Sequence, residues 1–382
     1  MQEKNKMRRD HPGTGRSLYI HIPFCGRKCA YCDFYSVAYD EGLAFSYISA
    51  LIPQIKAIEG PVSTIFIGGG TPTALSTPLL KKLLRGIRRL AGKGVEFTVE
   101  ANPESLSGEK LDLFLDEGVN RLSIGAQSFS DVKLKRLGRI HDAGKAMGAV
   151  MLSKKKGFDN LSIDLIFGAP EETLDDCSAE FARAVKLPVT HISCYCLTYE
   201  KGTPLFDAKR RGKVVPADEG DSARMYSLAM GYLPGHGFRH YEVSNFAKKG
   251  FECAHNLNYW QNNEYIGLGA SAVSYTGGVR KKHLPDVREY IKRSKAGEST
   301  VISSERLDGD RKARETAAVK IRTSEGIDFD WFKKKTGRDF VELEGKSVAC
   351  LVRNGLIRRT RSGIRLTKRG FMYCDSVSSE LM

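Results

Sequence analysis

The sequence lacks the features that place a protein in or beyond a membrane. Its 382 residues contain no run of about 18 apolar residues, so we expect no membrane-spanning helix. The first residues, MQEKNKMRRDHPGTGR, are polar and basic, and they contain no apolar segment of the kind found in signal peptides. We therefore expect a cytoplasmic protein in which residues 1–16 form a disordered basic tail.

Cysteine is scarce, with nine residues in the chain and only one close group. Because a cytosolic chain rarely forms disulfides, such a group indicates metal binding or catalysis. Cys25, Cys29 and Cys32 lie in HIPFCGRKCAYCDF, and no fourth cysteine follows nearby. Three thiolates could hold a [4Fe–4S] cluster with one iron left open, or a catalytic zinc ion with one open position. A closed zinc site would need His21 as its fourth ligand, although a histidine in a strand is more often a packed residue.

Acidic residues are too few to balance the basic ones. The chain has 60 Lys and Arg against 45 Asp and Glu, a formal charge of +15. This excess suits an anionic partner, which could be nucleic acid, an anionic membrane surface or a small polycarboxylate. The charge alone does not choose among these partners, and a solvated basic surface is favoured over a dedicated nucleic-acid face.

Six short β-rich segments alternate with amphipathic segments in the first 200 residues. The segments rich in β-branched and aromatic residues are 17–22, 63–70, 95–102, 120–127, 160–168 and 190–197. Between them, FSYISALIPQIKAI and PLLKKLLRGIRRL have apolar residues at helical spacing. This alternation predicts βαβ units and a parallel sheet. Six units are fewer than the eight of a TIM barrel, so we expect an α/β fold with a partial, open (β/α)6 barrel.

The rest of the chain has a different character. Residues 236–304 are rich in aromatic residues and asparagine and have no βαβ rhythm. Residues 305–382 suggest two helices, a small basic hairpin and a last helix, which resembles a winged-helix module in a smaller α+β domain. We therefore divide the chain into a tail at 1–16, a barrel at 17–235, a connecting region at 236–304 and a C-terminal module at 305–382.

Polar residues and glycines follow the predicted strands. The turn GGGTP spans residues 68–72, and Glu100, Gln127 and Asp164 come late in the third, fourth and fifth strands. Since ligands bind at the carboxyl ends of parallel strands, these residues are expected to share one opening. A carboxylate in such a place could accept hydrogen bonds from an ammonium or a hydroxyl group, although either could instead cap a helix. Arg139 could hold a carboxylate, or form a surface ion pair.

The spacing C-x₃-C-x₂-C, with Tyr31 before the last cysteine, resembles the signature of the radical S-adenosylmethionine (SAM) superfamily. That resemblance implies a [4Fe–4S] cluster bound by Cys25, Cys29 and Cys32, with SAM on the open iron. The barrel would then be a radical SAM core.

Further motifs resemble the oxygen-independent coproporphyrinogen III oxidase family over most of residues 17–382. They include YIHIPFC, GGGTPT, VEANPES, RLSIGAQSF, IDLIFGAP, CAHNLNYW and YIGLGASA. The resemblance implies that the SAM contacts are Tyr19, Tyr31, Gly69, Gly70, Thr71, Glu100, Gln127, Arg139 and Asp164. Within that set, Tyr19, Gly69 and Glu100 match contacts to the cluster-bound SAM, and the others match a second SAM of the true oxidase.

Two departures indicate the HemW branch of that family, which consists of haem chaperones. The oxidase has a further cysteine where this chain has Phe34, and only 18 residues precede Tyr19. The branch carries an HNxxYW motif, which is present here as His255, Asn256, Tyr259 and Trp260. The resemblance implies that these four residues contact haem, with the imidazole as an iron ligand. On the residues alone, a hydrogen-bonded core cluster is favoured.

Two details of the resemblance stay open. Cys253 is a second candidate for the axial ligand, although a lone cysteine is usually structural. Relatives often have histidine where this chain has Val273, and the consequence of that change does not follow from the sequence.

Three functions therefore stand in order. The first is a haem chaperone that passes haem to acceptor proteins such as respiratory cytochromes, and SAM turnover need not accompany it. The second is a coproporphyrinogen III oxidase, which Phe34 and the short N-terminus argue against. The third is a radical SAM enzyme acting on nucleic acid, supported by the basic C-terminal residues Arg358, Arg359, Arg361, Arg365, Lys368 and Arg369. We expect a flavodoxin- or ferredoxin-like electron donor, and the sequence leaves open a homodimer and a peripheral contact with an anionic membrane.

Overall fold

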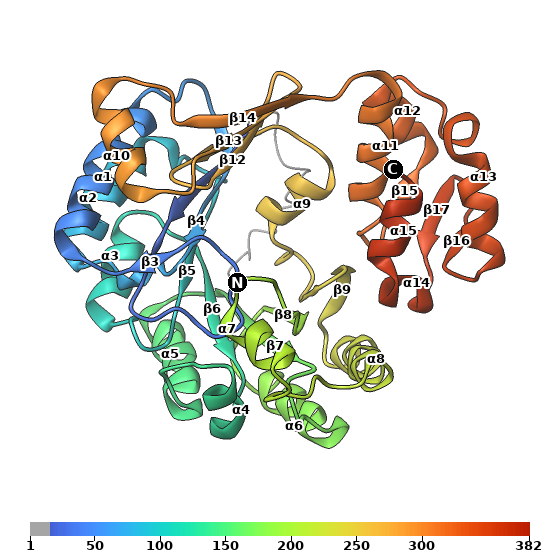
Figure 1. Ribbon diagram of the computed structural model, residues 1–382, viewed down its shortest axis with the longest axis horizontal. Helices are drawn as coiled ribbons and strands as arrows, with labels where there is room; N and C mark the ends of the chain where they lie inside the picture. Colours follow the sequence, from blue (N-terminus) through green and yellow to red (C-terminus); the bar gives the residue numbers. More distant parts are fainter. Residues whose placement is uncertain (1–15) are drawn as a thin grey trace, which may run out of the picture.

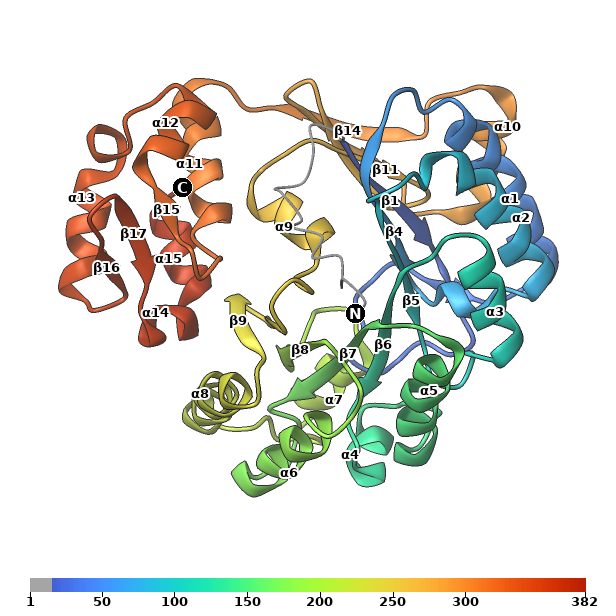
Figure 2. The ribbon, with the colours of Figure 1, turned by 180° about the vertical axis from the view of Figure 1, so that it is seen from behind.

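The structure is a computed structural model that describes residues 16–382, and its centre is one curved sheet (Figures 1 and 2). Residues 1–15, most of the expected tail, lie outside the described residues, and Arg16 is the first residue of β1. The strands of the large sheet are β1 (Arg16–Ile22), β4 (Val62–Gly69), β5 (Glu96–Ala101), β6 (Arg121–Gln127), β7 (Asn160–Phe167), β8 (His191–Cys196), β9 (Arg239–Glu242), β10 (Asn245–Ala247), β11 (Tyr265–Leu268), β12 (Val273–Thr276), β13 (Val279–His283) and β14 (Val301–Arg306). A separate pair, β2 (Phe24–Cys25) and β3 (Val37–Ala38), belongs to the cysteine loop.

The six predicted strands are all present, and they form the parallel core of the sheet. Within the described residues the strand order is β14-β13-β12-β11-β1-β4-β5-β6-β7-β8-β10-β9. The pairings from β1 through β8 are parallel and follow chain order, as consecutive βαβ units require. The order is linear from β14 to β9, so the sheet is open. The predicted α/β class with a mostly parallel sheet is confirmed.

Helices cover the outer face of this sheet. The first six, α1 to α6, lie along that face, whereas α9 lies over the opposite, concave face (Figures 1 and 2). The helices up to residue 296 are α1 (Glu41–Lys56), α2 (Thr77–Ile87), α3 (Gly108–Asp116), α4 (Asp131–Arg136), α5 (Ala143–Lys156), α6 (Leu174–Ala184), α7 (Pro204–Arg210), α8 (Glu219–Gly235), α9 (Ala254–Trp260) and α10 (Val287–Ala296), with short 3₁₀ turns at Pro72–Ala74 and Arg88–Leu90. In α2, every third or fourth residue is a buried leucine or isoleucine, which explains why this helix packs on the sheet. Among the described residues, no helix has both the length and the apolar character needed to cross a membrane.

The aromatic-rich region at 236–304 extends the sheet at both edges, which the sequence did not predict. Its first strands, β9 and β10, pair antiparallel beside β8. The remaining strands, β11 to β14, continue the sheet beyond β1, and β11 joins β1 in parallel. These strands have three to six residues each, too few to show a periodicity of their own. Their place depends on the sheet edges that the barrel leaves free.

The C-terminal part contains the helix, helix and hairpin that the sequence suggested. Its elements are α11 (Gly309–Lys320), β15 (Ile327–Asp328), α12 (Phe329–Thr336), α13 (Phe340–Arg353), β16 (Ile357–Arg359), β17 (Gly363–Leu366), α14 (Lys368–Met372) and α15 (Cys374–Glu380). The three strands form a small antiparallel sheet in the order β15-β17-β16. Helix α12 was not expected. The module contacts the barrel at β9, where the backbone N–H of Ser324 donates to the carbonyl of Tyr241 at 2.9 Å.

We predict that Gly267→Ala destabilises the barrel edge at β11. A Cβ atom at residue 267 would lie 2.0 Å from the backbone carbonyl oxygen of Val273, which is closer than any real contact. Overpacking of this kind costs about 3 kcal/mol in the free energy of unfolding, measured by chemical denaturation. Gly231→Ala in α8 is the matched control, because a Cβ atom there meets nothing within 4 Å and alanine favours a helix. Equal stability of the two variants would contradict the prediction.

Candidate functional site

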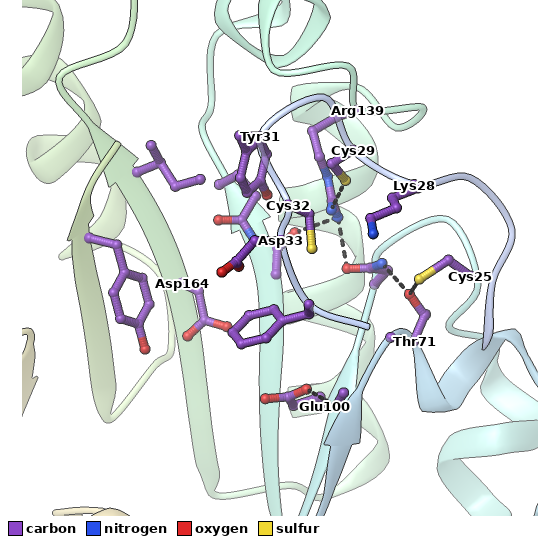
Figure 3. Close-up of a pocket in the computed structure, with 18 of the residues that line it drawn as sticks. Cys25, Lys28, Cys29, Tyr31, Cys32, Asp33, Thr71, Glu100, Arg139 and Asp164 are labelled. Carbon is purple, nitrogen blue, oxygen red and sulfur yellow. Dashed lines mark hydrogen bonds between the residues drawn. The ribbon is translucent and has the colours of Figure 1, made fainter. Parts of the chain in front are cut away.

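A cavity of about 450 Å³ opens at the carboxyl ends of the parallel strands (Figure 3). The cysteine loop forms one wall, and the turn after β4 and the ends of β5 to β8 form the others. This is the shared opening that the strand-end residues predicted. The cavity is lined by both charged and aromatic side chains, among them Lys28, Tyr31 and Tyr195.

Most of the predicted cofactor residues line this one cavity. The three cysteines do so, together with Tyr31, Gly69, Gly70, Thr71, Glu100, Gln127, Arg139 and Asp164. Tyr19 is the exception. Its ring lies on β1 below the cavity, and its hydroxyl pairs with His21 Nδ1 at 3.0 Å. Tyr19 therefore supports the neighbouring histidine in this structure.

The cysteine loop is held in place by backbone hydrogen bonds to two distant elements. The N–H of Ala30 donates to the carbonyl of Leu137 at 3.3 Å, just after α4. The N–H of Leu205 in α7 donates to the carbonyl of Ala30 at 2.9 Å. Gly138 adopts a φ of +72° against this loop, and a Cβ atom there would lie 3.2 Å from the Ala30 nitrogen. The loop is thus clamped between α4 and α7.

Two of the three thiols are in surroundings that disfavour their free thiolate. Burial raises the pKa of the Cys25 thiol, and it raises the pKa of the Cys32 thiol to about 11. Thiols of this kind give up their protons when a metal binds them, which couples ionisation to cluster assembly. Hydrogen bonds reach two of the sulfurs: Thr71 Oγ1 is 3.6 Å from Cys25 Sγ, and Arg139 Nη1 donates to Cys29 Sγ at 3.1 Å.

The donor set fits an iron–sulfur cluster better than a single ion. Over residues 16–382, no three His, Cys, Asp or Glu side chains converge closely enough to hold one metal ion. His21 is not a spare ligand, because its ring nitrogens face the Tyr19 hydroxyl and the Tyr35 carbonyl, the latter at 2.9 Å. A four-iron cube takes each thiolate on a different iron, so its ligands stand further apart than those of zinc. Three thiols around one cavity match that requirement.

The glycines after β4 serve close packing inside the protein. A Cβ atom at Gly68 would lie 2.6 Å from Glu100 Oε2, and one at Gly70 would lie 2.8 Å from the Phe24 carbonyl oxygen. Gly69 has a φ of +112° and leaves room for the His21 ring, which a Cβ atom would meet at 2.6 Å. The turn therefore brings the Gly69 N–H to Glu100 Oε2 at 3.1 Å.

Glu100 and Asp164 are two buried carboxyl groups that face the cavity (Figure 3). Burial raises the pKa of Glu100 to about 8, and the nearby charge of Asp164 adds to the effect. Burial also raises the pKa of Asp164, against the hydrogen bonds that its carboxylate accepts from Ser193 and Ser123. A cationic ligand in the cavity would favour the ionised carboxylates. The pair therefore suits an ammonium or sulfonium group.

The structure adds three polar residues that the sequence analysis missed. Asn102 lines the cavity between Thr71 and Arg139, accepting from Arg139 Nη2 at 2.7 Å. Glu104 and His141 lie behind Arg139, and their side chains pair at 3.0 Å. Asn102 and Glu104 belong to the quoted motif VEANPES, so their strand-end position was a usable signal. His141 had none, because its neighbours come together only in the fold.

Helix α9, which carries the HNxxYW motif, lies away from the cavity on the concave face of the sheet (Figure 1). His255 is 1% exposed and stacks on the Phe66 ring of β4 with centroids 5.0 Å apart. Its Nδ1 lies 2.7 Å from Thr64 Oγ1 and its Nε2 lies 3.0 Å from the Tyr259 hydroxyl. Burial lowers the pKa of His255 to about 3, so the ring is neutral. Neither ring nitrogen is free in this structure, which is the arrangement of a hydrogen-bonded core residue.

The other residues of α9 join the barrel to the C-terminal module. Trp260 packs under the Arg322 guanidinium, with the charge 5.3 Å from the ring centroid. The carboxylate of Glu96 accepts from the backbone N–H groups of Ala254 and His255, both at 3.1 Å, and so caps the start of α9. Asn256 is half-buried, and Cys253 is fully buried with its pKa raised to about 12 by burial.

Comparisons with known proteins agree with this geometry. The radical SAM superfamily model matches residues 19–182, and the HemN C-terminal domain model matches residues 307–373. The chain is 36% identical over 369 residues to heme chaperone HemW of Lactococcus lactis, which covers 96% of this chain and 97% of that protein. It is 36% identical over 370 residues to heme chaperone HemW of Bacillus subtilis, with 95% and 98% covered.

The chain belongs to the HemW family of the radical SAM superfamily.

A solved structure also shares the fold of this HemW-family chain. Coproporphyrinogen III oxidase (HemN) from Escherichia coli superposes with a TM-score of 0.83, covering 97% of this chain and 91% of that chain. The two sequences are 21% identical, so this likeness supports the fold alone. The predicted radical SAM fold and the predicted HemW resemblance are confirmed.

Phe34 distinguishes the cavity of this HemW-family chain from one with a fourth thiol. It lines the cavity and is 64% exposed, although it is a large apolar residue. The oxidase was expected to have a cysteine at this position. The cavity of this chain has an apolar surface there instead.

Glu100→Gln tests the buried carboxyl group. Because the folded protein holds a proton on Glu100 up to about pH 8 and the unfolded chain releases it near pH 4.5, the free energy of unfolding should fall between these values. Glutamine cannot titrate, so the variant should gain stability relative to the wild type as the pH rises through this window. Chemical denaturation of the ligand-free protein at several pH values measures this difference. The exposed Glu109→Gln is the control, and parallel curves for Glu100→Gln and the wild type would contradict the prediction.

Proposed function

We propose that this protein is a haem chaperone built on a radical SAM core. The observation that carries the proposal is the similarity to HemW proteins, printed as heme chaperones, over 96% of the chain. The arrangement of the cavity supports the cofactor part of the proposal, since three thiols and two buried carboxyl groups line it together. Haem is the cargo in this proposal, and the cluster and SAM are the resident cofactors.

The cavity residues divide the work of holding the cofactors. Cys25, Cys29 and Cys32 would ligate the [4Fe–4S] cluster, and SAM bound there would supply one-electron radical chemistry. Glu100 and Asp164 would accept hydrogen bonds from the ammonium or ribose hydroxyl groups of SAM. The remaining contacts to SAM would come from Tyr31, Gly69, Gly70, Thr71, Gln127 and Arg139.

Haem contact by the HNxxYW motif requires a change at α9. We propose that His255 meets haem iron only after its Nε2 has separated from the Tyr259 hydroxyl. The hydroxyl of Thr64 donates to Ser17 Oγ at 2.7 Å, so it is placed to accept from His255 Nδ1. The Nε2 lone pair then points to Tyr259, and a neutral imidazole with a free Nε2 is the form that ligates iron. Asn256 and Trp260 would contact the macrocycle in that open state.

The partners follow from the proposed cargo. Haem delivery needs haem-acceptor proteins, and respiratory cytochromes are the class that the resemblance implies. A flavodoxin- or ferredoxin-like protein would reduce the cluster. A homodimer and a peripheral contact with an anionic membrane stay predictions, as does the cytoplasmic location.

The variants Tyr259→Phe and His255→Ala test the haem contact. If the Tyr259 hydroxyl competes with iron for His255 Nε2, its removal should tighten haem binding by about 5-fold, the worth of one neutral hydrogen bond. His255→Ala should weaken binding and change the haem absorbance spectrum. Absorbance titrations of the reconstituted protein with haem measure both effects.

Tyr265→Phe is the matched control, because Tyr265 packs on the Tyr259 ring at 4.7 Å without contacting His255 Nε2. Unchanged haem binding and an unchanged spectrum in His255→Ala, with a lowered melting temperature, would assign the motif to the core and place the haem site elsewhere.

A separate assay decides between chaperone and oxidase. Anaerobically reconstituted protein with SAM, dithionite and coproporphyrinogen III should yield no decarboxylated product, because Phe34 replaces the oxidase thiol. Chromatography detects both this product and 5′-deoxyadenosine. Decarboxylation at or above one equivalent would make the protein an oxidase and overturn the proposal.

A further inference from the structure

A row of hydrogen bonds connects two of the three cluster cysteines behind the cavity wall (Figure 3). Thr71 Oγ1 contacts Cys25 Sγ at 3.6 Å, and Asn102 Nδ2 donates to Thr71 Oγ1 at 2.8 Å. Arg139 Nη2 donates to Asn102 Oδ1 at 2.7 Å, while its Nη1 donates to Cys29 Sγ at 3.1 Å. One carboxamide, that of Asn102, therefore joins the donors to both sulfurs.

We infer that Asn102 is a positioning residue for the iron–sulfur centre, which holds Thr71 and Arg139 so that each donates a hydrogen bond to one cluster thiolate. The inference rests on the proposed cluster at these cysteines. Asn102 touches neither sulfur in the structure and acts through its two neighbours. It goes beyond the ligands themselves, since Asn102 was not among the expected cofactor contacts.

The fold fixes both the place and the orientation of the Asn102 side chain. Asn102 follows β5 directly, and its backbone N–H donates to Thr73 Oγ1 at 3.2 Å. Gly125 of β6 gives the carboxamide room, because a Cβ atom there would lie 2.8 Å from Asn102 Oδ1. The carboxamide has one acceptor and one donor end, and Arg139 can only donate. The oxygen must therefore face Arg139, and the amide nitrogen then donates to Thr71.

The Arg139 guanidinium is held from its other side as well. Its Nη2 donates to the carbonyl of Gly125 at 3.0 Å, and Glu104 Oε2 lies 3.9 Å away. Burial alone would raise the pKa of Glu104, but the hydrogen bond from His141 and the charge of Arg139 hold it below its ordinary value. A fixed positive charge thus stands against Cys29, balanced by a carboxylate behind it.

Hydrogen bonds to cluster sulfurs stabilise the reduced, more negative state and raise the reduction potential. Outer residues that orient metal ligands also protect the site, and losing one typically costs about 10-fold or more in metal affinity. Both effects are properties of the cluster and can be measured without SAM turnover. A residue that only stabilised the fold would change neither.

The experiment compares reconstituted wild-type protein with Asn102→Ala. Redox titration under anaerobic conditions gives the midpoint potential, and absorbance decay in an iron chelator gives the rate of cluster loss. We expect a more negative potential and about 10-fold faster loss in the variant. Thr71→Val, which removes only the hydroxyl, should shift the potential in the same direction, whereas Thr71→Ser should behave as the wild type. The Thr71 pair carries the test if Asn102→Ala fails to fold.

Asn120→Ala is the matched control. Asn120 also anchors β5 through its carboxamide, accepting from Phe97 N–H and donating to the Val95 carbonyl, but it lies at the opposite end of the strand. This variant should lose thermal stability and keep the wild-type potential and loss rate. Wild-type values in both Asn102→Ala and Thr71→Val would overturn the inference and leave the proposed function standing. Wild-type protein that binds no iron after reconstitution would overturn both, and iron analysis separates the two results.

Discussion

The site depends on one geometric constraint, the common direction of the strands β1 and β4 to β8. Parallel neighbours end at the same edge of a sheet, so the residue that follows each strand faces the same opening. This places the Gly69 turn, Glu100, Gln127 and Asp164 around one cavity. The cysteine loop completes that cavity because Leu137 and Leu205 hold its backbone from two further helices.

A second constraint is that polar groups inside the barrel must find partners where water does not reach. The concave face satisfies them through short chains of side chains. Asn102 serves the cysteines in this way near the cavity, and Thr64 and Tyr259 serve His255 further down. Glu96 caps α9 with the same economy of groups, since it takes up N–H groups that the helix cannot pair internally.

The position of α9 changes how the family motif is understood. A histidine with aromatic neighbours was expected to offer an iron ligand, yet His255 makes two internal hydrogen bonds and Trp260 joins the barrel to the C-terminal module. The motif therefore connects three parts of the molecule: β4, the helix itself and Arg322. Release of His255 would loosen all three, which couples haem contact to the packing of the C-terminal module in the proposed chaperone.

The sequence by itself determined the six parallel strands, the radical SAM signature and the strand-end residues, because local periodicity and spacing encode them directly. It did not reveal the added strands β9 to β14, whose few residues pair only where the barrel leaves an edge. The roles of Asn102, Glu104 and His141, and the closed state of His255, also depended on tertiary structure. Their partners are 14 to 191 residues away along the chain, and hydrogen-bond partners at such separations leave no periodic pattern in the sequence.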